Sequence, residues 1–172
     1  MAAFKAGLEV NVQRLSTLAR TVGLEVIDAA ARELAFEVLQ RAMVYLENQV
    51  YTRPNAVVSG DKLGTVPEPT GALWNSGYVR SFTGEVPPGC QTESQAMSAA
   101  RSRMGEVVFG QAPPGPSRLG QAQVLFAVEY GLYVEMGTIF MAARPYLAPA
   151  ANEVQAFAER FVRAKLLEAG FS

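Results

Sequence analysis

The feature that most constrains the fold is residues 24–50, a segment in which apolar side chains recur with helical spacing on two faces. One stripe consists of Ile27, Ala31, Leu34, Val38, Ala42 and Tyr45, and the other of Phe36, Leu39, Met43, Leu46 and Val50. A helix with two apolar stripes must be covered on two sides. One cover is either a neighbouring subunit or the chain's own N-terminal helix, predicted over about residues 4–20, and the sequence leaves both alternatives open.

The remaining pattern predicts strands separated by long loops and a final helix. We expect strands over Gly77–Thr83, Met104–Phe109 and Gln123–Glu135, and a helix over about residues 146–168. One helical turn is expected within residues 70–77 and a short helix within 94–103, while 52–69 and 84–101 have the composition of loops. This order predicts an α+β fold in which an antiparallel sheet of three to four strands packs against long N-terminal and C-terminal helices. We expect a single domain over 1–172, with an N-terminal helical arm (1–23) and a core (24–168).

Composition excludes several classes of function. The chain has no histidine and one cysteine, Cys90, so Ser-His-Asp triads, Cys-His dyads and Cys/His zinc sites cannot form within it. The acidic residues Asp28, Glu33, Glu37 and Glu47 are interpreted as solvated helix charges, and Cys90 as a plain exposed thiol. We therefore expect no enzymatic activity, no catalytic residues, no cofactor and no metal.

Charge and hydropathy limit the partners. The net charge of −1 argues against a general binder of nucleic acid or anionic membranes. No apolar run approaches the ~20 residues of a membrane-spanning helix, and no signal peptide is evident at the N-terminus. We expect no membrane partner and synthesis in a cytoplasm.

Residues 128–149 combine an apolar stretch with glycine, proline and charged residues that are typical of a turn before a helix. Gly137 permits backbone angles that other residues resist, and Pro145 and Pro149 suit the first turn of a helix. Glu135 at a strand end and Arg144 before a helix flank one turn, and we expect the two side chains to pair, because a bidentate Arg–carboxylate bond would close it.

Residues 130–138 (YGLYVEMGT) and 143–150 (ARPYLAPA), with residues 70–76 (TGALWNS) upstream, resemble the signature of the tail-completion, or head–tail joining, family of long-tailed bacteriophages. The resemblance covers roughly residues 24–168, and only the pair of downstream motifs is specific. Met136 replaces the usual aromatic residue of the family, and Tyr146 stands for Phe. The matching positions predict structural or interface residues: Glu135, Gly137, Thr138, Arg144, Pro145, Tyr146, Gly71, Leu73 and Ser76. Whether they support a turn or contact another subunit is left open.

The resemblance implies a structural virion protein of the neck, assembled in the host cytoplasm. Members of the family form a ring, six-fold by the family's example, that completes the head-proximal end of the tail tube and joins tail to head. The implied partners are further copies of the chain, the tail tube or tail terminator protein, the head connector or stopper protein, and DNA that passes through the lumen without specific binding. The alternatives are a tail terminator ring and a small monomeric adaptor that binds a peptide at its sheet edge.

Overall fold

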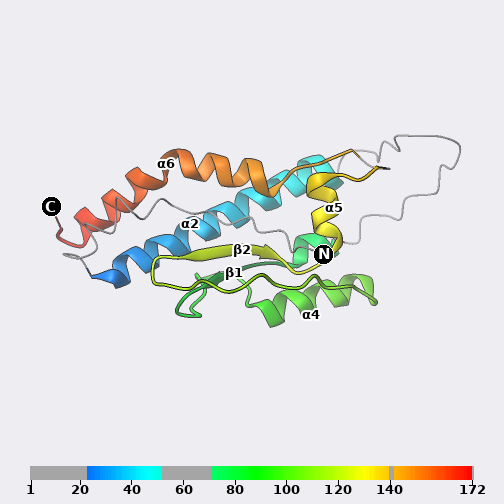
Figure 1. Cartoon of the computed structure of the whole chain (residues 1–172), viewed down its shortest axis with the longest axis horizontal. Helices are drawn as coiled ribbons and strands as arrows, with labels where there is room; N and C mark the ends of the chain where they lie inside the picture. Colours follow the sequence, from blue (N-terminus) through cyan, green and yellow to red (C-terminus); the bar gives the residue numbers. More distant parts are fainter. Residues whose placement is uncertain (1–22, 52–70, 140–141, 172) are drawn as a thin grey trace, which may run out of the picture.

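The computed structural model of the chain describes residues 23–51, 71–139 and 142–171. Its elements are, in order, α2 (Leu24–Tyr45), the π-helical turn η1 (Leu46–Tyr51), α3 (Ala72–Asn75), β1 (Gly77–Ser81), α4 (Glu93–Met104), β2 (Ala122–Phe126), α5 (Tyr130–Met136) and α6 (Leu147–Glu168). Apart from Gly23, the predicted N-terminal arm and the predicted loop 52–69 lie outside the described residues. Figure 1 shows α2 and α6 running along the long axis, the two strands below α2, and α5 near one end.

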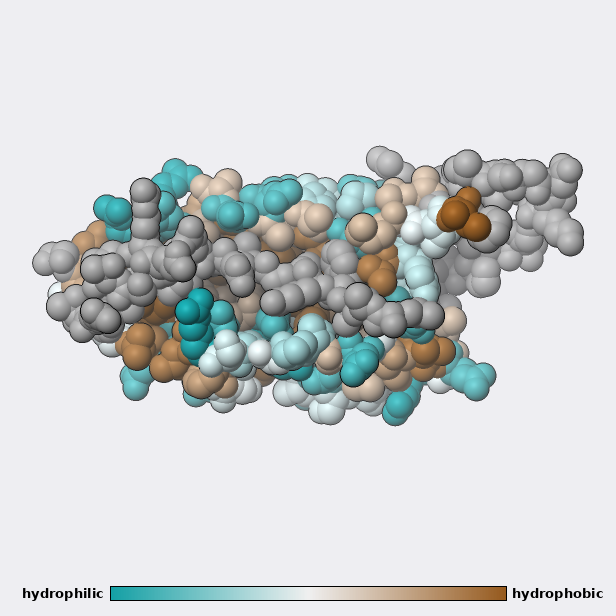
Figure 2. Space-filling view, viewed as in Figure 1, coloured by the Kyte–Doolittle hydropathy of each residue, from teal (hydrophilic) through white to brown (hydrophobic). Residues whose placement is uncertain are grey.

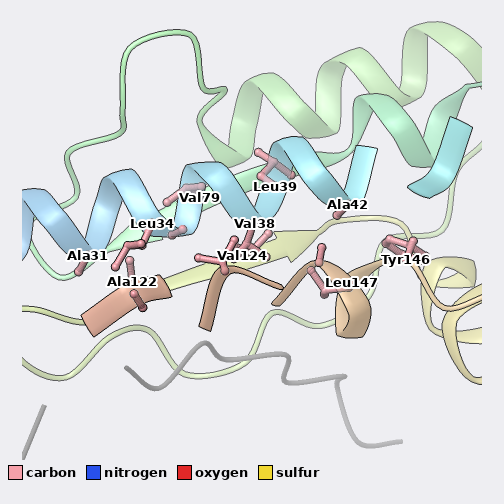
Figure 3. Packing of buried hydrophobic residues seen from close by; sticks show 14 of the residues in the cluster. Ala31, Leu34, Val38, Leu39, Ala42, Val79, Ala122, Val124, Tyr146 and Leu147 are labelled. Carbon is pink, nitrogen blue, oxygen red and sulfur yellow. The ribbon is translucent and has the colours of Figure 1, made fainter. Parts of the chain in front are cut away.

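The two long helices pack along each other and confirm the predicted α+β class. Buried residues of α6 recur every three or four positions and therefore share one face: Leu147, Ala150, Val154, Ala158, Val162 and Leu166. Alanine occupies several buried positions of α2, which lets a second helix approach closely. In Figure 3, Leu34 and Val38 of α2 gather with Val124 of β2 and Leu147 of α6, so the helices and the sheet share one core.

Both apolar stripes of α2 contribute buried residues to the core. Ile27, Leu34 and Val38 of one stripe are buried, and so are Leu39 and Leu46 of the other. The covering elements are α6 and the two strands, all of which contact α2. The predicted N-terminal helix lies outside the described residues, and so the two alternatives for a further cover, this helix or a neighbouring subunit, stay predictions.

The sheet consists of β1 and β2, which pair antiparallel from Gly77↔Phe126 to Ser81↔Ala122. Both strands are buried at nearly every position instead of at alternating positions. The reason is that α2 covers one side of the sheet and α4 lies on the other (Figure 1). The predicted strand at 77–83 is thus confirmed, two residues shorter at its end.

The prediction of three to four strands is wrong for the described residues, which form a two-stranded sheet. The segment predicted as a strand over 104–109 begins inside the last turn of α4, and Gly105 ends that helix with a φ of 72°. Only Phe109 pairs with the sheet region, through an isolated bridge to Val128. Thr92 and Gln95 form a capping box at the start of α4, which stabilises a helix in this segment.

The strand predicted over 123–135 divides into β2 and a helix, α5. The last bond between the two strand segments runs from the Ala127 N–H to the carbonyl of Ser76. The residues before Ser76 form α3, so β2 has no strand partner beyond this point. From there the backbone bonds become local, Gly131 N–H to Val128 O and Leu132 N–H to Glu129 O. Backbone groups that lose a strand partner must be satisfied within the segment itself, which a helix achieves.

The short helix expected within 94–103 is confirmed as α4, which therefore occupies the second half of the predicted loop 84–101. Pro87 is buried, and Cys90 donates its backbone N–H to the Pro87 carbonyl at 3.0 Å. Cys90 is half-buried and packs against the core, so its interpretation as an exposed thiol is wrong. Burial raises the pKa of this thiol, which disfavours the reactive thiolate.

Candidate functional site

Glu135 lies on α5 but acts on the start of α6. Its side chain is buried (4% exposed), and its carboxylate oxygens accept hydrogen bonds from the backbone N–H groups of Tyr146, Leu147 and Ala148 at 2.8, 2.9 and 2.9 Å. The first N–H groups of a helix have no partner within the helix and carry the positive end of its dipole. A carboxylate from another helix therefore caps α6, and the cap joins α5 to α6.

The chain between the two helices forms a loop tied at both ends to α5. Gly137 ends α5 with a φ of 75°, and its N–H bonds to the Tyr133 carbonyl at 2.8 Å. The Arg144 N–H bonds to the carbonyl of Val134, also at 2.8 Å. Residues 137–144 are hereafter called the 137–144 loop.

The remaining predicted residues of this turn differ in burial. Thr138 and Pro145 are exposed and Arg144 is half-buried. The carboxylate of Glu135 is occupied by the three amides of α6, and its expected ion pair with Arg144 stays a prediction.

Tyr146 and Leu73 meet at Gly131, which links the upstream motif to the downstream ones. The hydroxyl of buried Tyr146 donates to the Gly131 carbonyl at 3.3 Å, and its ring meets Phe126 edge-on with centroids 5.0 Å apart. A Cβ at Gly131 would lie 2.9 Å from both Leu73 Cδ1 and the Tyr146 hydroxyl. Glycine at this position is therefore what allows α3, α5 and the start of α6 to touch.

The upstream motif forms a compact turn that supports the sheet. Gly71 precedes α3 with a φ of 74°, and its carbonyl accepts from the Asn75 N–H and side-chain amide at 3.0 and 2.8 Å. The Ser76 hydroxyl donates to the Leu73 carbonyl at 2.8 Å, and the Ser76 carbonyl accepts from Ala127 N–H at 3.0 Å. Leu73 and Ser76 are both buried, so their roles here are packing and hydrogen bonding within the chain.

Sequence reasoning missed Asp28, which it interpreted as a solvated charge. Asp28 is buried, and its carboxylate accepts from Gly120 N–H at 3.1 Å and from the Thr83 hydroxyl at 3.2 Å. Arg32, one helical turn later, pairs with it at 3.3 Å and also with Glu85. The available signal was an Asp next to the apolar stripe residue Ile27 with an Arg four positions on, a spacing that puts both charges on one helix face.

Charged pairs also bridge α2 and α6 at the surface. Arg41 binds Glu153 at 2.6 Å and Glu37 at 2.8 Å, and the Tyr45 hydroxyl donates to Glu153. The hydrogen bond from Tyr45, and then that from Arg41, lowers the pKa of Glu153 below its ordinary value. Such exposed pairs add little stability each but fix the relative position of the helices.

A groove with a volume of about 540 Å³ lies between α4, β2, α5 and the segment 109–113. Its walls are largely apolar and aromatic, and include Tyr78, Met97, Phe109, Leu132, Tyr133 and Tyr146. Among the described residues that line it, the charged ones are Glu93 and Glu129. Burial and the neighbouring Glu93 raise the pKa of Tyr78 far above its ordinary value, so Tyr78 keeps its proton and can donate to that carboxylate.

Within residues 23–51, 71–139 and 142–171, no three Cys, Asp or Glu side chains are placed to hold one metal ion. Over the same ranges, no helix combines the length and apolarity needed to cross a membrane. The arrangement at Glu135, Gly131 and Tyr146 is a set of hydrogen bonds and close contacts between elements. No protein-family model, curated protein or solved structure matches the chain.

Proposed function

We propose that this chain is a structural subunit of a bacteriophage neck, which forms a ring at the head-proximal end of the tail tube and joins the tail to the head. The observation that carries the proposal is the junction at Gly131. The two separate sequence regions that resemble the tail-completion signature supply its contacting residues, Leu73 from one and Tyr146 from the other.

The junction gives the signature residues a physical task suited to assembly. Glu135 joins α5 to the start of α6, and Gly137 ends α5 where the 137–144 loop begins. The loop therefore starts from a fixed position, near one end of an elongated subunit (Figure 1). A binding surface fixed before contact loses less conformational freedom when the partner arrives. Ring closure requires heterologous contacts that repeat from subunit to subunit.

The charge of the chain suits a passage for DNA. A net charge of −1 gives the chain no overall excess of basic groups to attract phosphates. DNA would then move through the lumen without being retained. The partners of such a ring are further copies of the chain, the tail tube or terminator protein, and the head connector or stopper protein.

Mass measurement in solution over a range of concentrations, followed by electron microscopy of any large species, tests the proposal. A closed ring with an axial hole wide enough for duplex DNA would support it. Tails assembled without this chain should gain the ring and the capacity to join heads when the purified protein is added. A protein that leaves such tails unchanged and instead binds extended peptides as a monomer would be the adaptor, and the neck proposal would be wrong.

A further inference from the structure

The outer edge of β2, on the side away from β1, opens into the groove. The bond from the Ala127 N–H to the Ser76 carbonyl sets the phase of the pairing with β1. In an antiparallel pair every second residue bonds to the partner strand, and the residues between direct both backbone groups to the opposite edge. Leu125 therefore bonds to β1. The N–H and C=O groups of Val124 and Phe126 point away from it, and both residues line the groove.

These outward backbone groups are left without a protein partner. Val124 is only 2% exposed and Phe126 is half-buried. On this edge, neither residue has a backbone hydrogen bond to any other residue that the structure describes. Backbone groups removed from bulk water are nearly always paired, because leaving them unpaired costs about as much as a lost hydrogen bond. A buried, unpaired strand edge therefore favours an added strand.

The chain begins a third strand beside this edge and then leaves it. Phe109 bridges to Val128, one position beyond the end of the regular pairing. Further along, the carbonyl of Pro113 accepts a hydrogen bond from the guanidinium of Arg80 in β1 at 2.6 Å, so the segment is held elsewhere. Proline also has no N–H to offer to a strand. The position of a third strand beside β2 is thus marked at one end but left open along Val124 and Phe126.

Apolar side chains flank the open edge on both faces of the sheet. On one face, Leu125 clusters with Met97 and Phe109. On the other, Tyr146 and Leu147 belong to the main core, and all five residues line the groove. Figure 2 shows hydrophobic surface at the end of the molecule where Figure 1 places α5, which borders the groove. Successive side chains of an added strand point to opposite faces, so both sets would meet apolar walls.

The charge of the groove favours a basic residue in the occupant. Glu93 and Glu129 are the charged residues among the described ones that line it. Glu93 is already bonded to Tyr78. The half-buried side chain of Glu129 has neither an ion pair nor a hydrogen bond within the described ranges of the chain. A lysine or arginine of an incoming strand would complement this carboxylate.

We propose that β2 accepts a third strand from another protein, an extended segment with apolar side chains at alternating positions and a basic side chain opposite Glu129. Backbone hydrogen bonds to Val124 and Phe126 supply the affinity, and the two apolar walls of the groove supply the selectivity. The identity of the protein that donates the strand rests on the proposed function, because in the neck it would be one of the neighbouring virion proteins.

Peptide selection combined with amide hydrogen exchange tests the site. Random peptides of about ten residues, the upper range of strand lengths, are selected on the full-length protein, and the best binder is synthesised. It should carry alternating apolar residues and a lysine or arginine. At a free peptide concentration of about ten times its Kd, the Val124 and Phe126 amides should exchange about tenfold more slowly, as followed by NMR. Failure to select any peptide, or unchanged exchange of both amides, would overturn the proposal.

N-methylation of the selected peptide tests the backbone contact without altering the protein. Methylation of every second amide, namely those that bond to β2, should weaken binding by about tenfold or more, and methylation of the amides between should have little effect. Equal losses along the peptide would show that side chains alone hold it, contrary to strand addition.

Glu129→Lys tests the charge. Reversing this groove carboxylate should weaken binding of the basic peptide by about tenfold or more, measured by titration calorimetry. Glu159→Lys is the matched control, since Glu159 is an exposed acidic residue of α6 outside the groove. Equal affinities for the two variants would remove Glu129 from the site.

Three results separate this inference from the proposed function. Peptide binding at β2 by a protein that leaves tails unchanged would support the strand site and contradict the neck proposal. A ring on tails without any peptide binding would overturn the strand site alone. Protection of the Val124 and Phe126 amides that rises with the concentration of the protein by itself would show that a second copy supplies the strand, and would overturn the assignment to another protein.

Discussion

The interface between α2 and α6 and the junction between α3, α5 and α6 hold the molecule together in different ways. Along the long helices, stability comes from many small apolar contacts, with ion pairs such as Arg41–Glu153 at the surface. At the junction a few atoms matter, namely the Glu135 carboxylate, the three amides it accepts from, and the space at Gly131. Distributed packing tolerates single changes, whereas a junction built on one buried carboxylate does not.

The largest loss of stability is expected for Glu135→Ala. The change leaves the N–H groups of Tyr146, Leu147 and Ala148 without their acceptor in a largely buried place. We expect a loss of about 4 kcal/mol in the free energy of unfolding, measured by urea denaturation. Glu135→Gln, which keeps one acceptor oxygen, should lose less. A loss below about 1 kcal/mol for Glu135→Ala would remove the contrast between the two regions.

Val154→Ala probes the distributed packing. Val154 is fully buried in the middle of α6, and the change removes two methyl groups. The expected loss is about 2 kcal/mol from lost burial and the small cavity that remains, measured in the same denaturation experiment. Val44→Ala on α2 is the control, since Val44 is more than half exposed. If Val154→Ala lowered the free energy of unfolding as much as Glu135→Ala, the packing of α2 against α6 would be as sensitive to a single substitution as the junction.

Gly131→Ala should have a smaller effect with a specific signature. The added Cβ would meet Leu73 and Tyr146 at 2.9 Å, and those side chains must shift. Overpacking should cost about 2 kcal/mol, partly offset by about 1 kcal/mol of gained helix propensity. The change should alter the tyrosine signals in near-ultraviolet circular dichroism. Gly23→Ala, whose Cβ would meet nothing within 4 Å, is the control. An unchanged spectrum for Gly131→Ala would contradict the close approach of α3 and α6 at this point.

The smallest effect is expected from the surface pairs, and it depends on pH. The folded pKa of Glu153 lies below its ordinary value of 4.5, through the hydrogen bonds of Tyr45 and Arg41. The ionised Glu153 therefore contributes to the free energy of unfolding above pH 4.5, and this contribution is lost as the pH falls through the lower pKa of the folded state. Arg41→Ala should cause the smallest loss of the series at neutral pH and reduce the loss of stability on acidification, as measured by urea denaturation across the acidic range. An unaltered pH profile would show that the pair contributes nothing measurable.

The local pattern predicted the long elements well. The helices expected at 24–50 and 146–168 are α2 with η1 and α6, and the turn at 70–77 contains α3. Helical periodicity over many residues is a local property, so neighbouring structure has little power to override it. The expected third strand failed because residues 130–136 are apolar enough to suit either a strand or a buried helix, and the choice depended on whether a partner strand existed.

For the candidate site, the sequence selected residues that the structure brings together, but it did not predict their roles. Glu135 and Tyr146 belong to one motif, yet their link is a carboxylate on α5 that bonds to backbone amides of α6. Gly131 lies inside the same motif, and its contact with Leu73 depends on where α3 lies. Asp28 was misjudged because its partners Thr83 and Gly120 are far away in the sequence.

By itself, the sequence determined the class of the fold, the two long helices and the positions of the turn-forming residues, because periodicity, glycine and proline act over a few residues. The tertiary structure decided the number of strands, the cover over both stripes of α2, and the use of Glu135 as the cap of another helix. Each of these depends on which distant groups are available to bury a surface or to accept a hydrogen bond, and that is settled only when the elements pack.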